Sequence, residues 1–137
     1  MQLNNYLVFD GRAEEAFKFY ETALRGKIVA VFKHADTPAA AHVPADWQDK
    51  LMHISLQAGK SLLMGSAAPP DRYKKPQGFS VSVQIDDPAE AERVFAALSE
   101  GAKVTMPIQQ TFWAVRFGML TDRFDIPWMI NCEGAKQ

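Results

Sequence analysis

Alternating polar residues in the segment 51–57 are the first candidates for chemistry in this sequence. His53, Ser55 and Gln57 fall on one face of an extended chain, and Met52, Ile54 and Leu56 fall on the other. Imidazole is the side chain best suited to move protons near neutral pH, so His53 is the candidate catalytic residue if this face lines a cavity. The other interpretation is a hydrogen-bonded histidine with a structural role. Tyr6, from an earlier predicted strand, is a further candidate for the cavity wall.

A second polar row lies in the segment 78–85, where polar and apolar residues alternate strictly. Ser80, Ser82 and Gln84 share one face, opposite the apolar Phe79, Val81, Val83 and Ile85. Such alternation predicts a half-buried strand. Its polar face either lines a binding cavity with uncharged hydrogen-bonding groups or faces solvent, as antiparallel sheets often do.

The segment 109–117 combines amides, an indole and a guanidinium. Gln110, Trp113 and Arg116 are candidates for holding a flat or anionic ligand, by stacking and by bidentate hydrogen bonds. The alternative is that Trp113 packs in a core or an interface and that Arg116 pairs with a carboxylate such as Asp122.

Apolar stripes at helical spacing predict two helices that position these residues. The first spans about 12–26, and the second spans about 87–101. Strand-like runs follow each helix, at 28–34, 51–57 and 61–65 after the first and at 103–106, 112–120 and 127–131 after the second. A polar, proline-containing loop covers 35–50. The two remaining histidines are His34, at the end of the predicted strand 28–34, and His42, in this loop, and both are expected to have surface roles.

The chain contains an internal repeat. A shift of 76 residues places the segment 10–28 over the segment 86–104, with identical residues at Asp10/Asp86, Ala13/Ala89, Glu14/Glu90, Phe19/Phe95 and Lys27/Lys103. Each copy reads as a strand, a helix and three more strands. This order predicts an α+β fold of paired βαβββ modules, with a mixed, mostly antiparallel sheet and one helix per module outside it.

The length of 137 residues suits a single domain over 1–137. Within it we expect module one at 1–66, a linker at 67–77 and module two at 78–131. The net charge of -1 argues against a nucleic-acid-binding surface, and no apolar run approaches the roughly 20 residues of a membrane span. The single cysteine, Cys132, allows no internal disulfide and favours a cytoplasmic location.

Three strings carry a resemblance to a known family. They are YLVFDGRAEEAFKFY at 6–20, MHISL and LLMGS within 52–66, and QTFWAVRFGMLTDRFDIPWMIN at 110–131. Together with the repeat, they resemble the vicinal oxygen chelate superfamily (glyoxalase, bleomycin-resistance protein, extradiol dioxygenase), and most of all its PhnB-like branch. The resemblance implies modules that fold into half-open cups, and a binding cavity that is completed by two modules or two chains.

The resemblance also implies a divalent metal, held by a histidine on the first strand and a glutamate on the last strand of each module. The matching positions lie within 4–6 and at Leu63 or Met64 in module one, and at Ser80 and Met129 in module two. None of these is histidine or glutamate, and thioethers suit soft metals instead. We therefore expect no metal and no cofactor. The family's D-x-F-G turn has Asp125 in place of glycine, a change that turn geometry tolerates.

These features favour a protein of this superfamily that binds an unknown small organic ligand without the usual metal. Two alternatives stay open, a metal-dependent lyase, isomerase or dioxygenase of the same superfamily and a metal-free acid–base enzyme that uses His53 or Tyr6. The expected assembly is a homodimer, because short modules leave open sheet edges and the segment 112–128 is rich in aromatic residues. Neither a nucleic acid nor a membrane is expected as a partner.

Overall fold

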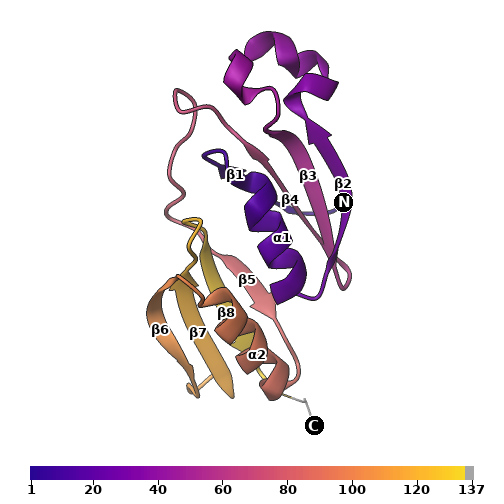
Figure 1. Cartoon of the computed structure of the whole chain (residues 1–137). Coiled ribbons are helices and arrows are strands. Elements are labelled where there is room, and N and C mark those ends of the chain that lie inside the picture. Colours follow the sequence, from indigo (N-terminus) through magenta and orange to yellow (C-terminus); the bar gives the residue numbers. More distant parts are fainter. Residues whose placement is uncertain (135–137) are drawn as a thin grey trace. The chain divides into compact units, whose positions relative to one another are not determined.

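The computed structural model describes residues 1–134 and contains two compact units, Met1–Lys75 and Pro76–Gln137. Each unit has one helix and one four-stranded sheet, drawn in Figure 1. The boundary between the units lies within the stretch 67–77 that the sequence favours as a linker. We call the units unit 1 and unit 2.

Unit 1 has the element order β1, α1, β2, β3, β4. Their bounds are Asn5–Phe9 for β1, Ala13–Ala23 for α1, Lys27–Lys33 for β2, Leu51–Ala58 for β3 and Ser61–Ala67 for β4. The sheet order is β1-β4-β3-β2, with β1 and β4 parallel and the other two pairs antiparallel. Three short 3-10 helices, His34–Asp36, Pro38–His42 and Ala45–Trp47, fill the long connection from β2 to β3.

Unit 2 repeats this topology. Its elements are β5 at Val81–Gln84, α2 at Pro88–Leu98, β6 at Lys103–Gln109, β7 at Arg116–Thr121 and β8 at Pro127–Cys132. The sheet order β5-β8-β7-β6 matches that of unit 1 strand for strand, with β5 and β8 as the parallel pair. The predicted α+β fold of paired βαβββ modules is therefore confirmed, with one mixed, mostly antiparallel sheet in each module.

Each helix packs its apolar stripe against one face of its own sheet. In α1 the side chains of Ala13, Ala16, Phe17, Tyr20 and Ala23 are buried, and in α2 those of Ala91, Val94, Phe95 and Leu98 are buried. A glycine lets each helix approach closely. A Cβ on Gly65 would lie 2.7 Å from the Phe17 ring, and a Cβ on Gly118 would lie 2.6 Å from the Phe95 ring.

Two strands of unit 2 are shorter than the sequence predicts. Strand β5 begins at Val81, so Ser80 lies outside it, whereas the alternation predicts a strand from residue 78. Strand β7 begins at Arg116 because the residues before it form a turn, in which the Thr111 and Ala114 backbones bond to each other. Alternation alone does not reveal which residues pair with a neighbouring strand, and in each of these two segments only some of the residues do.

The prediction of a surface role for His34 is wrong, since this side chain is 7% exposed. The connection from β2 to β3 folds back over it. The His34 backbone N–H donates to the Lys50 carbonyl, and the ring Nε2 lies 3.3 Å from the Ala67 carbonyl oxygen. His42 is exposed, as predicted.

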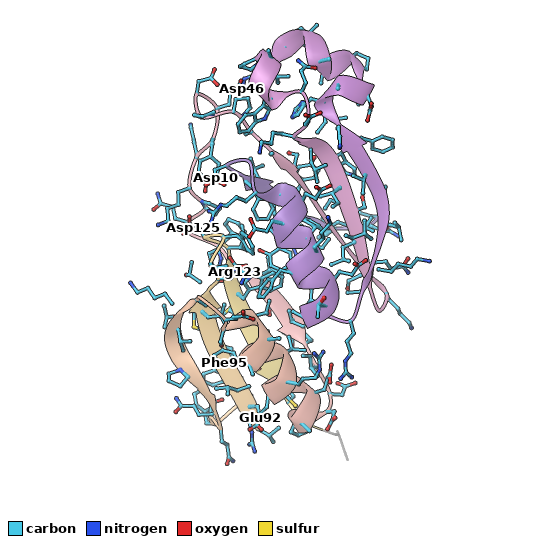
Figure 2. The ribbon with its side chains drawn as sticks, viewed as in Figure 1. Asp10, Asp46, Glu92, Phe95, Arg123 and Asp125 are labelled. Atoms are coloured by element: carbon cyan, nitrogen blue, oxygen red, sulfur yellow. The ribbon has the colours of Figure 1, made fainter. Side chains whose placement is uncertain are left out.

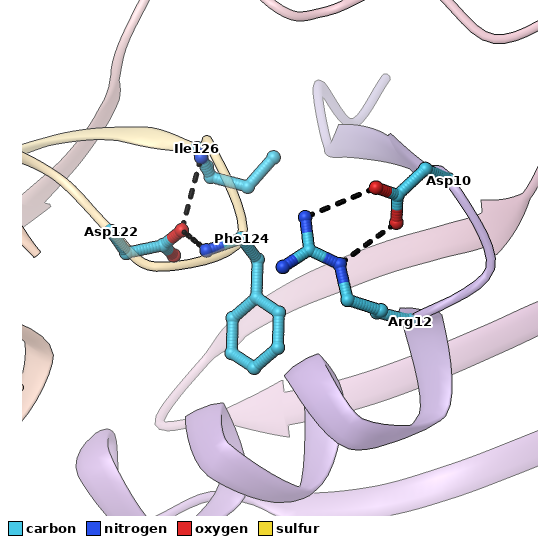
Figure 3. A network of polar contacts seen from close by, with 5 residues as sticks. All are labelled: Asp10, Arg12, Asp122, Phe124 and Ile126. Atoms are coloured by element: carbon cyan, nitrogen blue, oxygen red, sulfur yellow. Dashed lines mark hydrogen bonds and ion pairs between the residues drawn. The ribbon is translucent and has the colours of Figure 1, made fainter. Parts of the chain in front are cut away.

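A buried carboxylate organises the turn between β7 and β8. Asp122 Oδ1 accepts hydrogen bonds from the backbone N–H groups of Phe124 and Ile126, at 2.8 and 3.0 Å (Figure 3). Its other oxygen accepts from the Trp128 indole at 2.8 Å. The turn places Asp125 at a φ of 71°, a left-handed conformation that aspartate adopts more readily than most residues.

Within residues 1–134, neither helix is long and apolar enough to cross a membrane.

Candidate functional site

Strands β1, β4 and β3 place Tyr6, Met64 and Ser55 side by side on one face of unit 1. The register pairs Tyr6 with Met64, and Met64 with Ser55. The opposite face carries the buried side chains of Leu7, Phe9, Ile54, Leu56 and Leu63, which belong to the core beneath α1. The face with Tyr6 therefore points away from the helix, and we call it the unit 1 face.

A hydrogen-bonded row crosses the unit 1 face. The Tyr6 hydroxyl lies 3.2 Å from His53 Nδ1, and His53 Nε2 lies 2.8 Å from the Ser55 hydroxyl. A neutral imidazole has one N–H donor and one acceptor, so one hydroxyl donates to the ring and the other accepts from it. Since hydroxyls do both, either tautomer of His53 is fully bonded. Both hydroxyls can also accept from a protonated ring.

Aromatic side chains surround this imidazole. The rings of Tyr6 and Phe32 lie 5.7 and 6.4 Å from the His53 ring. Ser55 is only 6% exposed, while Tyr6 is 46% exposed. The row thus runs from the buried residue Ser55 to the half-exposed residue Tyr6. Gln57 follows along β3 but lies outside the row, because its side chain is exposed and donates to the Gly59 carbonyl at 3.4 Å.

Unit 2 presents a different set of groups on the matching face. The register aligns Ser82 with Met129, and Met129 with Met119, while Gln84 aligns with Asn131. Gln84 donates to the Ser82 hydroxyl at 2.9 Å, and Asn131 donates to the Gln84 amide oxygen at 2.7 Å. We call the side of this sheet that carries Ser82, Gln84, Phe117, Met119, Met129 and Asn131 the unit 2 face.

The three candidates from the segment 109–117 do not come together. Arg116 lies beside α2, where its Nε donates to the Glu92 carboxylate at 2.8 Å. Its ion-pair partner is therefore Glu92 and not Asp122, the carboxylate that the sequence suggested. Figure 2 labels Glu92 and Phe95 on that helix. Gln110 is exposed after the end of β6. Trp113 adjoins the unit 2 face, because its ring lies edge-on to Phe117 with the centroids 5.2 Å apart.

Sequence reasoning missed Asn131 on the unit 2 face. Asn131 lies two residues after Met129 in the last apolar run, so an extended chain places both side chains on one face, and this spacing is the signal in the sequence that points to Asn131. The resemblance places the first-strand metal-ligand position of module two at Ser80, which precedes β5. The register instead places Ser82 opposite Met129. The pairing partner of a strand depends on contacts that are distant in sequence, so the alternation pattern gives the face but not the neighbours.

Comparison with known proteins explains the repeated module. The family model of the glyoxalase/bleomycin resistance protein/dioxygenase superfamily matches residues 2–130. The chain belongs to this superfamily. The glyoxalase-superfamily chain is 30% identical to the protein YjdN from Escherichia coli over 139 residues, which covers 96% of this chain and 95% of YjdN.

Solved structures share the fold of this chain. The crystal structure of PA1353 from Pseudomonas aeruginosa has a TM-score of 0.89 and 46% sequence identity, with 98% of this chain and 99% of that one covered. The PhnB protein from Bacillus cereus has a TM-score of 0.79, covering 98% and 100% of the two chains. Its 20% identity shows the fold alone.

The donor groups of this superfamily chain do not fit the divalent metal that the family resemblance implies. Met64 and Met129, at the last-strand positions where the resemblance implies a glutamate, lie opposite Tyr6 in unit 1 and opposite Ser82 in unit 2. These supply a phenol, a hydroxyl and two thioethers, whereas hard divalent cations prefer carboxylates, carbonyls or imidazoles. Over the described residues 1–134, no group of three or more His, Cys, Asp or Glu side chains is placed to hold a metal ion.

Proposed function

We propose that this chain is a small-molecule-binding protein of the glyoxalase/bleomycin resistance superfamily that holds an organic ligand without the usual metal. The observation that carries the proposal is the row Tyr6–His53–Ser55 on the unit 1 face. It offers hydrogen-bonding groups next to the apolar surface of Met64 and Phe32. Binding sites for organic ligands combine such an apolar wall with a few placed polar groups.

The donor set of the strands favours binding over metal-dependent chemistry. The metal-dependent mechanism of the family polarises oxygens of the substrate with a Lewis acid, and such an ion needs charged or imidazole ligands to stay bound. His53 is the only imidazole on the unit 1 face, and both of its ring nitrogens already lie within hydrogen-bond distance of hydroxyls. A lyase, isomerase or dioxygenase that depends on a divalent metal is thus the weaker alternative.

The proposal is tested with the full purified chain and a library of small organic compounds. We expect at least one compound to raise the thermal unfolding midpoint, and its affinity to fall about tenfold in Tyr6→Phe or His53→Ala, the loss of about one hydrogen bond. His42→Ala is the matched control, because His42 is exposed. About one divalent metal per chain in elemental analysis, with ligand binding lost on chelation, would contradict the proposal.

A metal-free acid–base reaction at His53 is the second candidate. The imidazole lies between two hydroxyls at 3.2 and 2.8 Å, so a proton taken up at one ring nitrogen can leave from the other. We expect His53→Gln to keep most of the ligand affinity but to abolish turnover of any substrate that the library reveals. If His53→Gln turns that substrate over at the wild-type rate, this second candidate fails and the binding function stands.

We also propose that the protein is a cytoplasmic homodimer. Strand β2 is an edge of its sheet and exposes Val29, Val31 and Phe32, which are apolar groups of the kind that interfaces cover. Phe112 is 97% exposed and stacks edge-on with Trp113. Light scattering at micromolar concentration should report about twice the chain mass of 15.3 kDa. A folded particle of one chain mass would contradict the dimer. Fractionation of cells that express the chain tests the location.

A further inference from the structure

Asn131 on the unit 2 face ends its hydrogen-bonded row with an unused acceptor. The residue is only 9% exposed, and its Oδ1 atom is buried with no hydrogen-bond partner among the described residues. Its amide nitrogen is engaged by Gln84, which in turn bonds to Ser82. A buried carbonyl oxygen without a donor is costly, and such atoms in native proteins generally have a partner. The row therefore has one place at which an incoming donor is stabilising.

The surroundings of this oxygen are aromatic and soft. On one side the register places Phe117 directly opposite Asn131, and the centroids of the Phe117 and Trp113 rings lie 5.2 Å apart. Along the strands lie the half-buried Met129 and Met119, and Met106 continues the row on β6. Thioethers adapt their shape and make favourable contacts with aromatic rings. A flat ring fits such a wall better than a branched aliphatic group does.

The residues that the register places opposite Asn131, namely Gln84 and Phe117, carry no formal charge. Lys103 lies on the same side of the sheet but opposite Thr121, at the other end of β7. Arg116, the cation next to Phe117 in the sequence, lies beside α2 and is paired with Glu92. An anionic group placed against the Asn131 oxygen would lose its hydration and face another acceptor, with no cation to compensate. The face thus selects against carboxylates and phosphates.

We infer that the unit 2 face binds a neutral aromatic ring that carries one uncharged hydroxyl or N–H group. That group donates to Asn131 Oδ1, while the ring lies against Phe117, Trp113 and the thioethers of Met119 and Met129. This inference rests on the proposed function, for which it names the ligand class.

The test compares phenol with toluene, which has nearly the same shape but no polar group, and with benzoate, which is anionic. The full chain is labelled with ¹³C in the methionine methyl groups, and the signals are assigned by single Met→Leu substitutions. We expect phenol to shift the methyl signals of Met119 and Met129 but not that of Met1. Phenol should bind about tenfold more tightly than toluene, which is the effect of one hydrogen bond, and benzoate should cause no shift.

Asn131→Leu, which has nearly the same shape, should remove the difference between phenol and toluene. Asn5→Leu, at an exposed position of β1, is the matched control and should keep it. The comparison of the two ligands on the unaltered chain decides the question even if Asn131→Leu does not fold. Equal affinities for phenol and toluene, or phenol binding that leaves Met119 and Met129 unshifted, would overturn the inference. The proposed function fails separately, if no compound of the wider library binds.

Discussion

On the face away from the helix, unit 1 carries an imidazole between two hydroxyls, whereas unit 2 carries two amides beside a row of thioethers. The two sheets nevertheless share one strand order and one register. Tyr6, Met64 and Ser55 form a line across β1, β4 and β3, and Ser82, Met129 and Met119 form the same line across β5, β8 and β7. The side chains on this face can therefore change without altering how the strands pair.

The helix side shows the opposite behaviour. Both helices bury alanines and large apolar side chains, and both sheets supply a glycine beneath a phenylalanine ring, although the glycine lies on β4 in unit 1 and on β7 in unit 2. Packing density at this contact is the shared requirement. The two modules therefore share close packing on the helix side of the sheet, whereas the side chains on the other side differ in type.

The largest expected effect separates the two tryptophans of unit 2. Trp128 is 1% exposed and donates to Asp122, while Trp113 is 46% exposed. Trp128→Ala should lower the free energy of unfolding by about 3–5 kcal/mol, and Trp113→Ala by under about 1 kcal/mol. Urea unfolding followed by circular dichroism measures both. The sequence groups these residues as equivalent aromatics, and equal losses would show that burial does not distinguish them.

The next effect compares two carboxylates drawn in Figure 3. Asp122 is buried and satisfies two backbone N–H groups and an indole, so Asp122→Ala should cost about 2–4 kcal/mol. Asp10 forms an exposed ion pair with Arg12 at 2.9 Å, and Asp10→Ala should cost under about 1 kcal/mol. Adding salt should weaken only the second contribution. A larger loss for Asp10→Ala in the same denaturation assay would refute this ranking.

Glycines beneath the helices test whether both cores are packed to the same limit. Gly65→Ala and Gly118→Ala each force a methyl group into a phenylalanine ring, and each should cost about 1–3 kcal/mol. Ser61→Ala, at an exposed position of β4, is the control and should change stability by under about 0.5 kcal/mol. Differential scanning calorimetry gives the comparison. A stabilised Gly118→Ala protein would mean that α2 has room which α1 lacks.

The smallest effects concern the two polar rows themselves. Gln84→Leu leaves the amide nitrogen of the buried Asn131 without its acceptor and should cost about 1–2 kcal/mol. Tyr6→Phe removes a half-exposed hydroxyl and should cost under about 1 kcal/mol, because solvent can replace it at His53. Chemical denaturation ranks the two. If Tyr6→Phe is the more costly change, the unit 1 row is more deeply enclosed than its exposed fractions indicate.

Much of the fold follows from patterns that lie close together in the sequence. The stripe of Ala91, Val94, Phe95 and Leu98 predicts α2 and the face that it buries. Asp87 caps that helix by accepting a hydrogen bond from the Ala89 N–H. The alternation in 51–57 predicts that Ile54 and Leu56 lie opposite His53, and both are buried. Helix and strand periodicity are local properties of the backbone, so the sequence reports them directly.

The candidate site was harder to predict. Tyr6, His53 and Ser55 were each singled out from the sequence, but the hydrogen bonds that join them cross from one strand to another, 47 residues apart in the case of Tyr6 and His53. Whether these residues and Ser80, Ser82, Gln84, Gln110, Trp113 and Arg116 bind a ligand remains a prediction. The structure shows that Asn131 donates a hydrogen bond to Gln84 and that Arg116 lies beside Glu92.

The repeated module and the helix faces can be predicted from the sequence alone, because these depend on residue type and short-range spacing. Three features emerge only in the folded chain: His34 is buried, Ser82 rather than Ser80 lies opposite Met129, and the Asn131 oxygen has no donor among residues 1–134. Each of these depends on strand register and loop packing. Register is fixed by hydrogen bonds between distant segments, and a shift of one residue would exchange the two faces of a strand.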